Sequence, residues 1–300
     1  KKDLLKHDPG DIHDVWRLKE AQSFVRNQKE GGWWKYPGKG EDERFPEDYI
    51  QIETYRILGF LIEKYGFDYR SQVIKKAAEF LFRCQKTEGD FRGIYGNQYS
   101  PNYSSAILEL LIRAGYHKDK RVLRGLDWLL SMRQEDGGWA IPFRTINNRR
   151  YTEIVGGDTL KTDRSKPFSH FVTGVVLRSF AAHPDYRNKK EILNAGKLLI
   201  SRMFEKDKYP DRNTPDFWEK FSYPFWQTDL LSTLDSVSSM GFSTKIPKIK
   251  KAIEWIIARQ QNDGLWRLKL LKTRYRDQVY WITLAICRVF KKFYQDNKYD

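Results

Sequence analysis

Two residues of this chain have the type and the setting for acid–base chemistry, Asp229 and His170. Asp229 follows Tyr-Pro-Phe-Trp-Gln-Thr and precedes a strongly apolar stretch, so we expect its carboxyl group to be partly desolvated. Desolvation raises the pKa of a carboxyl group and suits it to donate a proton. His170 stands near a predicted helix start, where it would support that acid. The structural alternatives are helix capping or an arginine pair for Asp229, and a packed, hydrogen-bonded ring for His170.

Six more residues are candidates for ligand binding, because they are polar or aromatic and lie in or beside predicted apolar helices. They are Glu53, Tyr103, Trp226, Arg276, Asp277 and Tyr280. Ring faces attract cations, and the planar guanidinium group of Arg276 suits a diphosphate. The carboxyl group of Glu53 is instead a candidate partner of Asp229 or Asp277 in glycoside cleavage. As structural alternatives, the rings fill the core and Arg276 is an exposed surface charge.

Neither a metal site nor a cofactor is predicted. The sequence contains no Asp-x-Asp-Asp motif and no Asp-Asp-x-x-Asp motif, and its acidic clusters at 41–43 and at Asp158 with Asp163 have other spacings. Cys84 and Cys287 both fall in predicted helices without a convincing set of further ligands, so we do not expect zinc. The chemistry of this chain is therefore expected to rest on its own side chains.

A repeated phrase shows how these residues are positioned. It ends a helix, passes through a turn, usually rich in glycine, and reaches an aromatic residue, and it returns after roughly 50 to 70 residues. The copies are Arg26–Trp33, Arg83–Phe91, Arg133–Trp139, Arg259–Trp266 and a degenerate Arg202–Tyr209 that lacks both Gln and Gly. Units of this length must stack on neighbours to bury their apolar faces. We therefore assign the repeat residues to structure: Gln28, Gln85, Gln134, Gln261, Trp33, Trp139 and Trp266.

Each phrase is followed by a second helix that is richer in aromatic and small residues. These second helices are predicted at about 47–65, 101–115, 167–183, 221–240 and 275–295, and Gly66, Gly115 and Gly241 stop three of them. Alternation typical of strands is almost absent, so the chain is predicted to be all-α. About five to six hairpins, with an outer and an inner ring of helices, would form one α/α toroid domain over residues 1–300. The chain begins with Lys rather than Met, so we expect that further sequence precedes it.

The phrase at Gln134–Trp139, with its relatives at Gln28, Gln85 and Gln261, resembles the QW-type repeats of squalene and oxidosqualene cyclases. The same toroid occurs in the β subunits of protein prenyltransferases. The resemblance covers nearly the whole chain and implies an isoprenoid or another apolar ligand in an aromatic central cavity. It also implies terpene cyclisation or prenyl transfer, but the Asp-x-Asp-Asp motif that protonates the substrate in the cyclases is missing.

An atypical enzyme with Asp229 as the acid and His170 in support is one hypothesis that follows. The alternatives are a binding or scaffold toroid without catalysis, and a carbohydrate-active α/α barrel. The connection at 140–166, with its basic residues, is either a lid, a membrane-facing flap or a solvated loop.

The composition limits the setting in which the protein acts. A formal charge of +15 is compatible with a lysine-rich surface, an anionic membrane or a diphosphate ligand, and no recognised motif accompanies it that favours nucleic acid. The 40% hydrophobic content excludes wholesale disorder, and no apolar run is long enough to span a bilayer. We therefore expect a cytoplasmic protein, with peripheral membrane contact as an alternative.

Overall fold

The computed structural model describes residues 2–5, 10, 13–38, 46–146, 154–211, 214–271 and 277–295. It divides into two compact units. The N-terminal unit comprises Gly10–Gln134 and Ala140–Lys166, and the C-terminal unit comprises Lys1–Pro9, Glu135–Trp139 and Pro167–Asp300. Within the described residues the regular structure is helical, and the only β contact is an isolated bridge between Phe221 and Leu270. The prediction of an all-α protein is confirmed.

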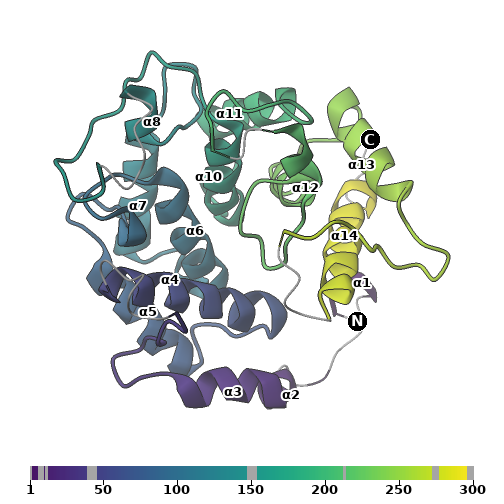
Figure 1. Ribbon diagram of the computed structural model, residues 1–300. Helices are drawn as coiled ribbons and strands as arrows, with labels where there is room; N and C mark the ends of the chain where they lie inside the picture. The colour runs from purple at the N-terminus through teal and green to yellow at the C-terminus, as the bar shows by residue number, and fades with distance from the viewer. Residues whose placement is uncertain are drawn as a thin grey trace. The chain divides into compact units, whose positions relative to one another are not determined.

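Figure 1 shows the helices in their order along the chain. The N-terminal unit contains α2 (His13–Trp16), α3 (Lys19–Asn27), α4 (Pro46–Gly59), η2 (Phe60–Lys64), α5 (Gln72–Cys84), η3 (Gly93–Tyr95), α6 (Pro101–Leu111), η4 (Ile112–Tyr116), α7 (Lys120–Ser131) and α8 (Pro142–Ile146). The C-terminal unit contains α1 (Lys2–Leu5), α10 (His170–Ala182), α11 (Lys190–Ser201), η5 (Pro215–Glu219), α12 (Leu230–Ser239), α13 (Pro247–Ile257) and α14 (Gln278–Gln295).

Helices that end at a repeat phrase and helices that follow one differ in how much of their surface they bury. In α7, which ends at a repeat phrase, Val122, Leu126 and Leu129 are fully buried on one face while charged residues cover the other. In α6 and α10 nearly every residue is buried, as expected for a helix surrounded by others. In the C-terminal unit α10 contacts both α11 and α12, and it lies beside them in Figure 1.

Three helix starts differ from their predicted positions by three residues or more. The helix expected from 167 begins at His170, the one expected from 221 only at Leu230, and the one expected from 275 at Gln278. In the first two cases the residue just before the helix, Ser169 or Asp229, accepts a hydrogen bond from a backbone N–H of the first turn and so fixes where the helix begins. The predicted stops are confirmed, because the three glycines have φ angles of 65°, 105° and 81° at Gly66, Gly115 and Gly241.

The repeat phrases bind the inner helices through one recurring contact. The backbone N–H of the aromatic residue donates to a hydroxyl group on the helix that follows. The pairs are Trp34 with Thr54 (3.3 Å), Phe91 with Ser104 (2.9 Å), Trp139 with Thr173 (2.9 Å) and Trp266 with Thr283 (3.1 Å). The first copy therefore uses Trp34, which is 2% exposed, and the assignment of Trp33 to this position was wrong by one residue.

The glutamines of the first two copies bind neighbouring outer helices together. Gln28 Nε2 donates to the carbonyl of Val73 (2.9 Å) at the start of α5, and Gln85 Nε2 donates to that of Arg121 (2.9 Å) at the start of α7. Each also donates to a carbonyl of its own turn, which confirms the predicted structural role. In the last copy Gln260 takes this position instead of Gln261, because its Nε2 donates to the carbonyl of Gly264 (3.0 Å).

Candidate functional site

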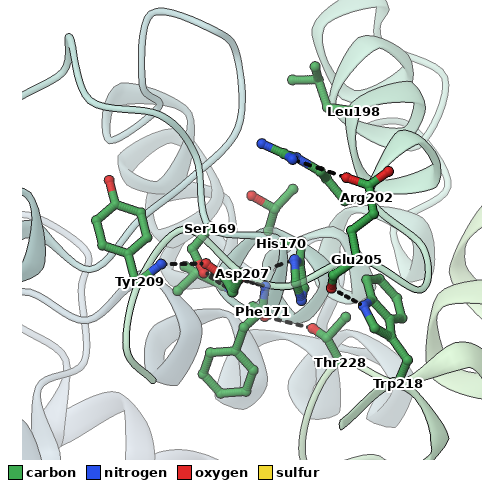
Figure 2. A network of polar contacts seen from close by, with 12 residues as sticks. Ser169, His170, Phe171, Leu198, Arg202, Glu205, Asp207, Tyr209, Trp218 and Thr228 are labelled. Carbon is green, nitrogen blue, oxygen red and sulfur yellow. Dashed lines mark hydrogen bonds and ion pairs between the residues drawn. The ribbon is translucent and has the colours of Figure 1, made fainter. Parts of the chain in front are cut away.

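The candidate site lies where α10 and α12 begin, next to the degenerate fourth phrase of the C-terminal unit. The two helix starts are in contact: Thr228 Oγ1 donates to the carbonyl of Phe171 at 2.6 Å (Figure 2). A Cβ at Gly174 would lie 2.3 Å from the Thr228 side chain, so this close approach requires glycine. We call this region the α10–α12 site.

Asp207 organises the start of α10 from the loop of the fourth phrase (Figure 2). Its Oδ2 accepts hydrogen bonds from Ser169 Oγ and from the Phe171 N–H, both at 2.9 Å, and lies 3.3 Å from His170 Nδ1. Its Oδ1 accepts from the Tyr209 N–H at 3.1 Å. The carboxylate is buried and completes the first turn of α10.

His170 is held in one orientation by this carboxylate and by a tryptophan. Its ring lies 4.7 Å from that of Trp218, whose Nε1 donates to the Glu205 carbonyl at 2.9 Å (Figure 2). Burial lowers the pKa of His170 more than the Asp207 carboxylate raises it, so the ring is neutral near neutral pH. Because Nδ1 faces Asp207, the proton belongs on Nδ1, and Nε2 is an acceptor without a partner among the described residues.

Asp229 caps α12 with one carboxyl oxygen and buries the other, so the structural alternative of a helix cap is confirmed. Its Oδ1 accepts the Ser232 N–H at 2.7 Å while its own N–H donates to Ser232 Oγ at 3.0 Å, so Asp229 caps α12. Its Oδ2 is buried and has no hydrogen-bond partner in the described structure. Burial raises the pKa of Asp229 to about 7, although Ser232 and the charge of Arg178 lower it. One oxygen is thus structural, and the other is a protonatable group in a dry setting.

Thr233 shows where the fourth repeat departs from the others. Thr173 in α10 and Thr233 in α12 occupy the same place, four residues after the N-cap. Thr173 Oγ1 accepts the Trp139 N–H, whereas Thr233 Oγ1 is buried and lacks a partner within the described residues. Trp218 reproduces a different contact of the repeats: its indole Nε1 donates to the carbonyl of Glu205, just after α11, much as that of Trp266 donates to the carbonyl of Ile256 in α13.

Sequence reasoning identified Asp229 and His170 but missed Asp207 and Thr233. The one available signal was the degenerate fourth phrase, which contains Asp207 where the other copies have their glycine turn. Nothing in the sequence showed that Asp207 would reach the start of α10.

Two of the other predicted site residues are engaged in local contacts. Glu53 in α4 pairs with Arg56, whose Nε donates to Oε2 at 2.8 Å. Asp277 Oδ2 accepts from Trp281 Nε1 at 2.6 Å. The other four are placed as follows: Tyr103 lies in α6, the half-buried Trp226 precedes α12, Tyr280 is 62% exposed on α14, and Arg276 is outside the described residues.

The long connection is tied to its own unit over its described part. Gln98, which is 1% exposed, donates from Nε2 to the carbonyls of Ile154 (2.8 Å) and Asp158 (2.9 Å), and its Oε1 accepts the Leu160 N–H (3.0 Å). Arg164 donates to the Arg133 carbonyl at 2.9 Å. Arg149 and Arg150 fall outside the described residues.

No group of three or more His, Cys, Asp or Glu side chains among the described residues is placed to hold a metal ion. None of the helices there combines the length and the apolar character needed to cross a membrane.

The chain is similar to known cyclases over most of its length. A model of the squalene-hopene cyclase C-terminal domain matches residues 46–162 and, in a second alignment, 105–280. A lanosterol synthase of Aspergillus fumigatus is 28% identical over 167 residues, which is 52% of this chain and 20% of that enzyme. A probable squalene–hopene cyclase of Sinorhizobium fredii is 30% identical over 94 residues, 30% of this chain and 14% of the other. The aligned parts thus span about a fifth or less of these relatives.

Solved structures confirm the fold class. The type II terpene cyclase MstE from Scytonema, in complex with its product merosterolic acid A, superposes with a TM-score of 0.55 at 15% identity over 96% of this chain and 75% of that one. A polysaccharide lyase superposes with a TM-score of 0.53 at 12% identity over 100% of this chain and 88% of that one. At such identities the likeness shows the fold alone, which is the all-α toroid expected from the repeats.

Proposed function

Because this chain belongs to the squalene-hopene cyclase C-terminal domain family, we propose that it binds an isoprenoid or another long apolar ligand at the α10–α12 site and protonates it. The MstE structures support the ligand class, since that enzyme holds a geranylgeranyl dihydroxybenzoate substrate and a terpenoid product. The observation that carries the proposal is the buried Asp229 Oδ2, which has a raised pKa and no partner among the described residues.

The proposed step follows from the environment of Asp229. The proton on Oδ2 passes to one carbon of an alkene, the π electrons form the new C–H bond, and the other carbon becomes a cation. The carboxylate left behind keeps the Ser232 N–H as a donor, and the charge of Arg178 favours it. A raised pKa keeps the acid protonated until the substrate arrives.

His170 would complete the reaction as the base. Its Nε2 can accept a proton from a carbon next to the cation, whose C–H electrons then form a new alkene. Asp207 stabilises the imidazolium ion that results, because its carboxylate already lies 3.3 Å from Nδ1. The substrate would thus gain one proton from Asp229 and lose one to His170.

The test combines binding and turnover on the full chain. Thermal shifts are measured with prenyl diphosphates and polyprenols of increasing length, followed by mass spectrometry of the products. We expect stabilisation that grows with chain length, and product formation that Asp229→Asn abolishes while binding persists. Asp235→Asn is the matched control, because Asp235 lies on the same helix but pairs with Lys292 at 2.6 Å. Absence of any shift, or equal turnover by the Asp229 variant, would contradict the proposal.

The paired-carboxylate hypothesis finds less support in the local contacts. The Glu53 carboxylate is engaged by Arg56, and that of Asp277 accepts from Trp281. These contacts give both carboxyl groups a local structural partner, which a pair that cleaves a glycosidic bond does not need.

A further inference from the structure

Two buried polar atoms without hydrogen-bond partners among the described residues lie close together in the N-terminal unit, between α4 and α6. Gln51 Oε1 and the hydroxyl group of Tyr103 are both buried, and neither has a hydrogen-bond partner in the part of the chain that the structure describes. The two side chains are 4% and 6% exposed, respectively. A buried polar atom without a partner costs about 1–3 kcal/mol, so two of them side by side require an explanation.

Gly93 in η3 shows how close the two atoms are. A Cβ added to this glycine would lie 2.5 Å from Gln51 Oε1 and 2.6 Å from the Tyr103 hydroxyl oxygen. The two oxygens are therefore at most about 5 Å apart. Two hydrogen bonds of about 2.8 Å that meet at one tetrahedral oxygen separate their outer atoms by about 4.6 Å. The upper bound of about 5 Å thus leaves a separation at which one oxygen can bridge the two atoms.

The chemistry of the pair restricts what can bridge it. Gln51 Oε1 only accepts a hydrogen bond, whereas the Tyr103 hydroxyl group can donate one. Burial raises the pKa of Tyr103 well above its ordinary value, so its proton stays in place. The bridging group must therefore donate to Gln51 and accept from Tyr103, which a neutral hydroxyl group does and a ketone or an ether does not.

The surroundings of the pair are aromatic. The rings of Tyr55 and Tyr95 lie 6.4 Å and 6.1 Å from that of Tyr103. The turn η3 covers the pair, and it has glycines with φ of 48° and 59° at Gly93 and Gly96. A Cβ at Gly93 would collide with both side chains, so this close approach of the turn requires glycine.

We propose that Gln51 and Tyr103 form a hydroxyl-binding site within the N-terminal unit, which prefers an isoprenoid alcohol or a prenylated phenol over a pure hydrocarbon. This inference goes beyond the proposed function, whose site lies in the C-terminal unit, and rests on it only for the isoprenoid ligand class. The hydroxyl group satisfies both orphaned atoms at once, and the aromatic rings contact the adjoining carbon atoms.

The experiment measures the affinities of farnesol, of its hydrocarbon analogue farnesene and of a short allylic alcohol for the full chain. Tyr103→Phe removes only the orphaned hydroxyl group. Tyr99→Phe is the control, because Tyr99 donates to Glu88 at 2.7 Å and already has its partner. We expect wild type to prefer farnesol about tenfold over farnesene. The preference disappears in Tyr103→Phe and persists in the control.

The melting temperature without ligand separates the hydroxyl site from a structural water. Removal of an unsatisfied hydroxyl group leaves the melting temperature unchanged or raises it, whereas removal of one that binds a buried water lowers it. A lowered melting temperature with an unaltered preference for farnesol would overturn the inference.

The probes also distinguish this inference from the proposed function. Equal binding of farnesol and farnesene contradicts the hydroxyl site and leaves isoprenoid binding intact. Binding of the short alcohol alone, lost in Tyr103→Phe, contradicts the isoprenoid ligand and keeps the hydroxyl site. If none of the three probes binds, both proposals are wrong.

Discussion

The first turns of α6 and α12 have the same arrangement of side chains, but only α6 receives the contact that completes it. In α6 the N-cap is Ser100, and Ser104, four residues later, accepts the backbone N–H of Phe91. In α12 the N-cap is Asp229, and Thr233 receives no such donor from the described chain.

The difference lies in the loop that precedes each helix. The second repeat keeps its turn and its aromatic residue, whereas the fourth has replaced them with Asp207 and, much later, Trp218. Repeats that keep the rule serve packing, whereas the repeat that breaks it contains Asp207 and Asp229, two residues of the candidate site. Departures from local consistency are where function is expected.

The largest loss of stability should follow truncation of Trp218, the tryptophan that replaces the repeat aromatic residue in the fourth repeat. Trp218 is 1% exposed and Trp139 is 0% exposed, so each leaves a large cavity when it is truncated. We expect Trp218→Ala and Trp139→Ala each to lower the free energy of unfolding by about 3–5 kcal/mol in urea titrations. A cost below about 1 kcal/mol for Trp218→Ala would show that it does not replace the repeat aromatic residue.

The cap of α12 should make stability depend on pH, unlike the uncharged cap of α6. The pKa of Asp229 rises from 3.8 to about 7 on folding, so the folded state binds the proton more tightly. Its contribution is present in full below pH 4 and is lost as the pH rises through 7, on the order of 4 kcal/mol in all. Asp229→Asn should remove this slope in urea titrations between pH 4 and pH 8. An unchanged slope in the variant would mean that Asp229 is ionised in the folded protein.

Removal of the Ser104 hydroxyl group should lower stability, whereas removal of the Thr233 hydroxyl group should leave it almost unchanged. Ser104→Ala leaves the buried Phe91 N–H without an acceptor and should cost about 1–3 kcal/mol. Thr233→Val removes a group that has no protein partner in the described structure and should change stability by less than about 0.5 kcal/mol. Chemical denaturation of both variants decides the comparison. Equal losses would show that Thr233 has a partner after all.

The smallest effect distinguishes two glutamines of the repeat. Gln85→Ala removes the bond to the Arg121 carbonyl of the next outer helix and should cost about 1 kcal/mol. Gln260 is exposed and bonds only within its own turn, so Gln260→Ala should be nearly neutral. Thermal unfolding of the two variants is a sufficient measurement, and a larger loss for Gln260 would reverse the assignment.

The fold was predictable because its signals repeat along the chain. Apolar spacing, the stops at Gly66 and Gly115, and the recurring phrase each appeared several times, so single errors did not change the result. Register was less predictable. Trp33 and Trp34 are adjacent aromatic residues, and only the backbone geometry shows which one turns inward.

The site was predictable only where burial alone decides the chemistry. The apolar context of Asp229 was sufficient to expect a raised pKa, and the structure agrees. Asp207 could not be found, because its role depends on a loop that folds back to a helix start 38 residues earlier. The pair of Gln51 with Tyr103 depends on the placement of Gly93, which no local pattern indicates.

The hydrogen bonds of the repeat glutamines in the N-terminal unit affect how its outer helices unfold locally. They link α3 to α5 and α5 to α7 in series, whereas Gln134 of the next phrase donates to the carbonyls of Asp163 and Lys166 in its own connection. In a one-dimensional array, such nearest-neighbour bonds set how far a local opening spreads. The three outer helices should therefore exchange their amide hydrogens as one cooperative block, whose edge falls where the series of glutamine bonds stops.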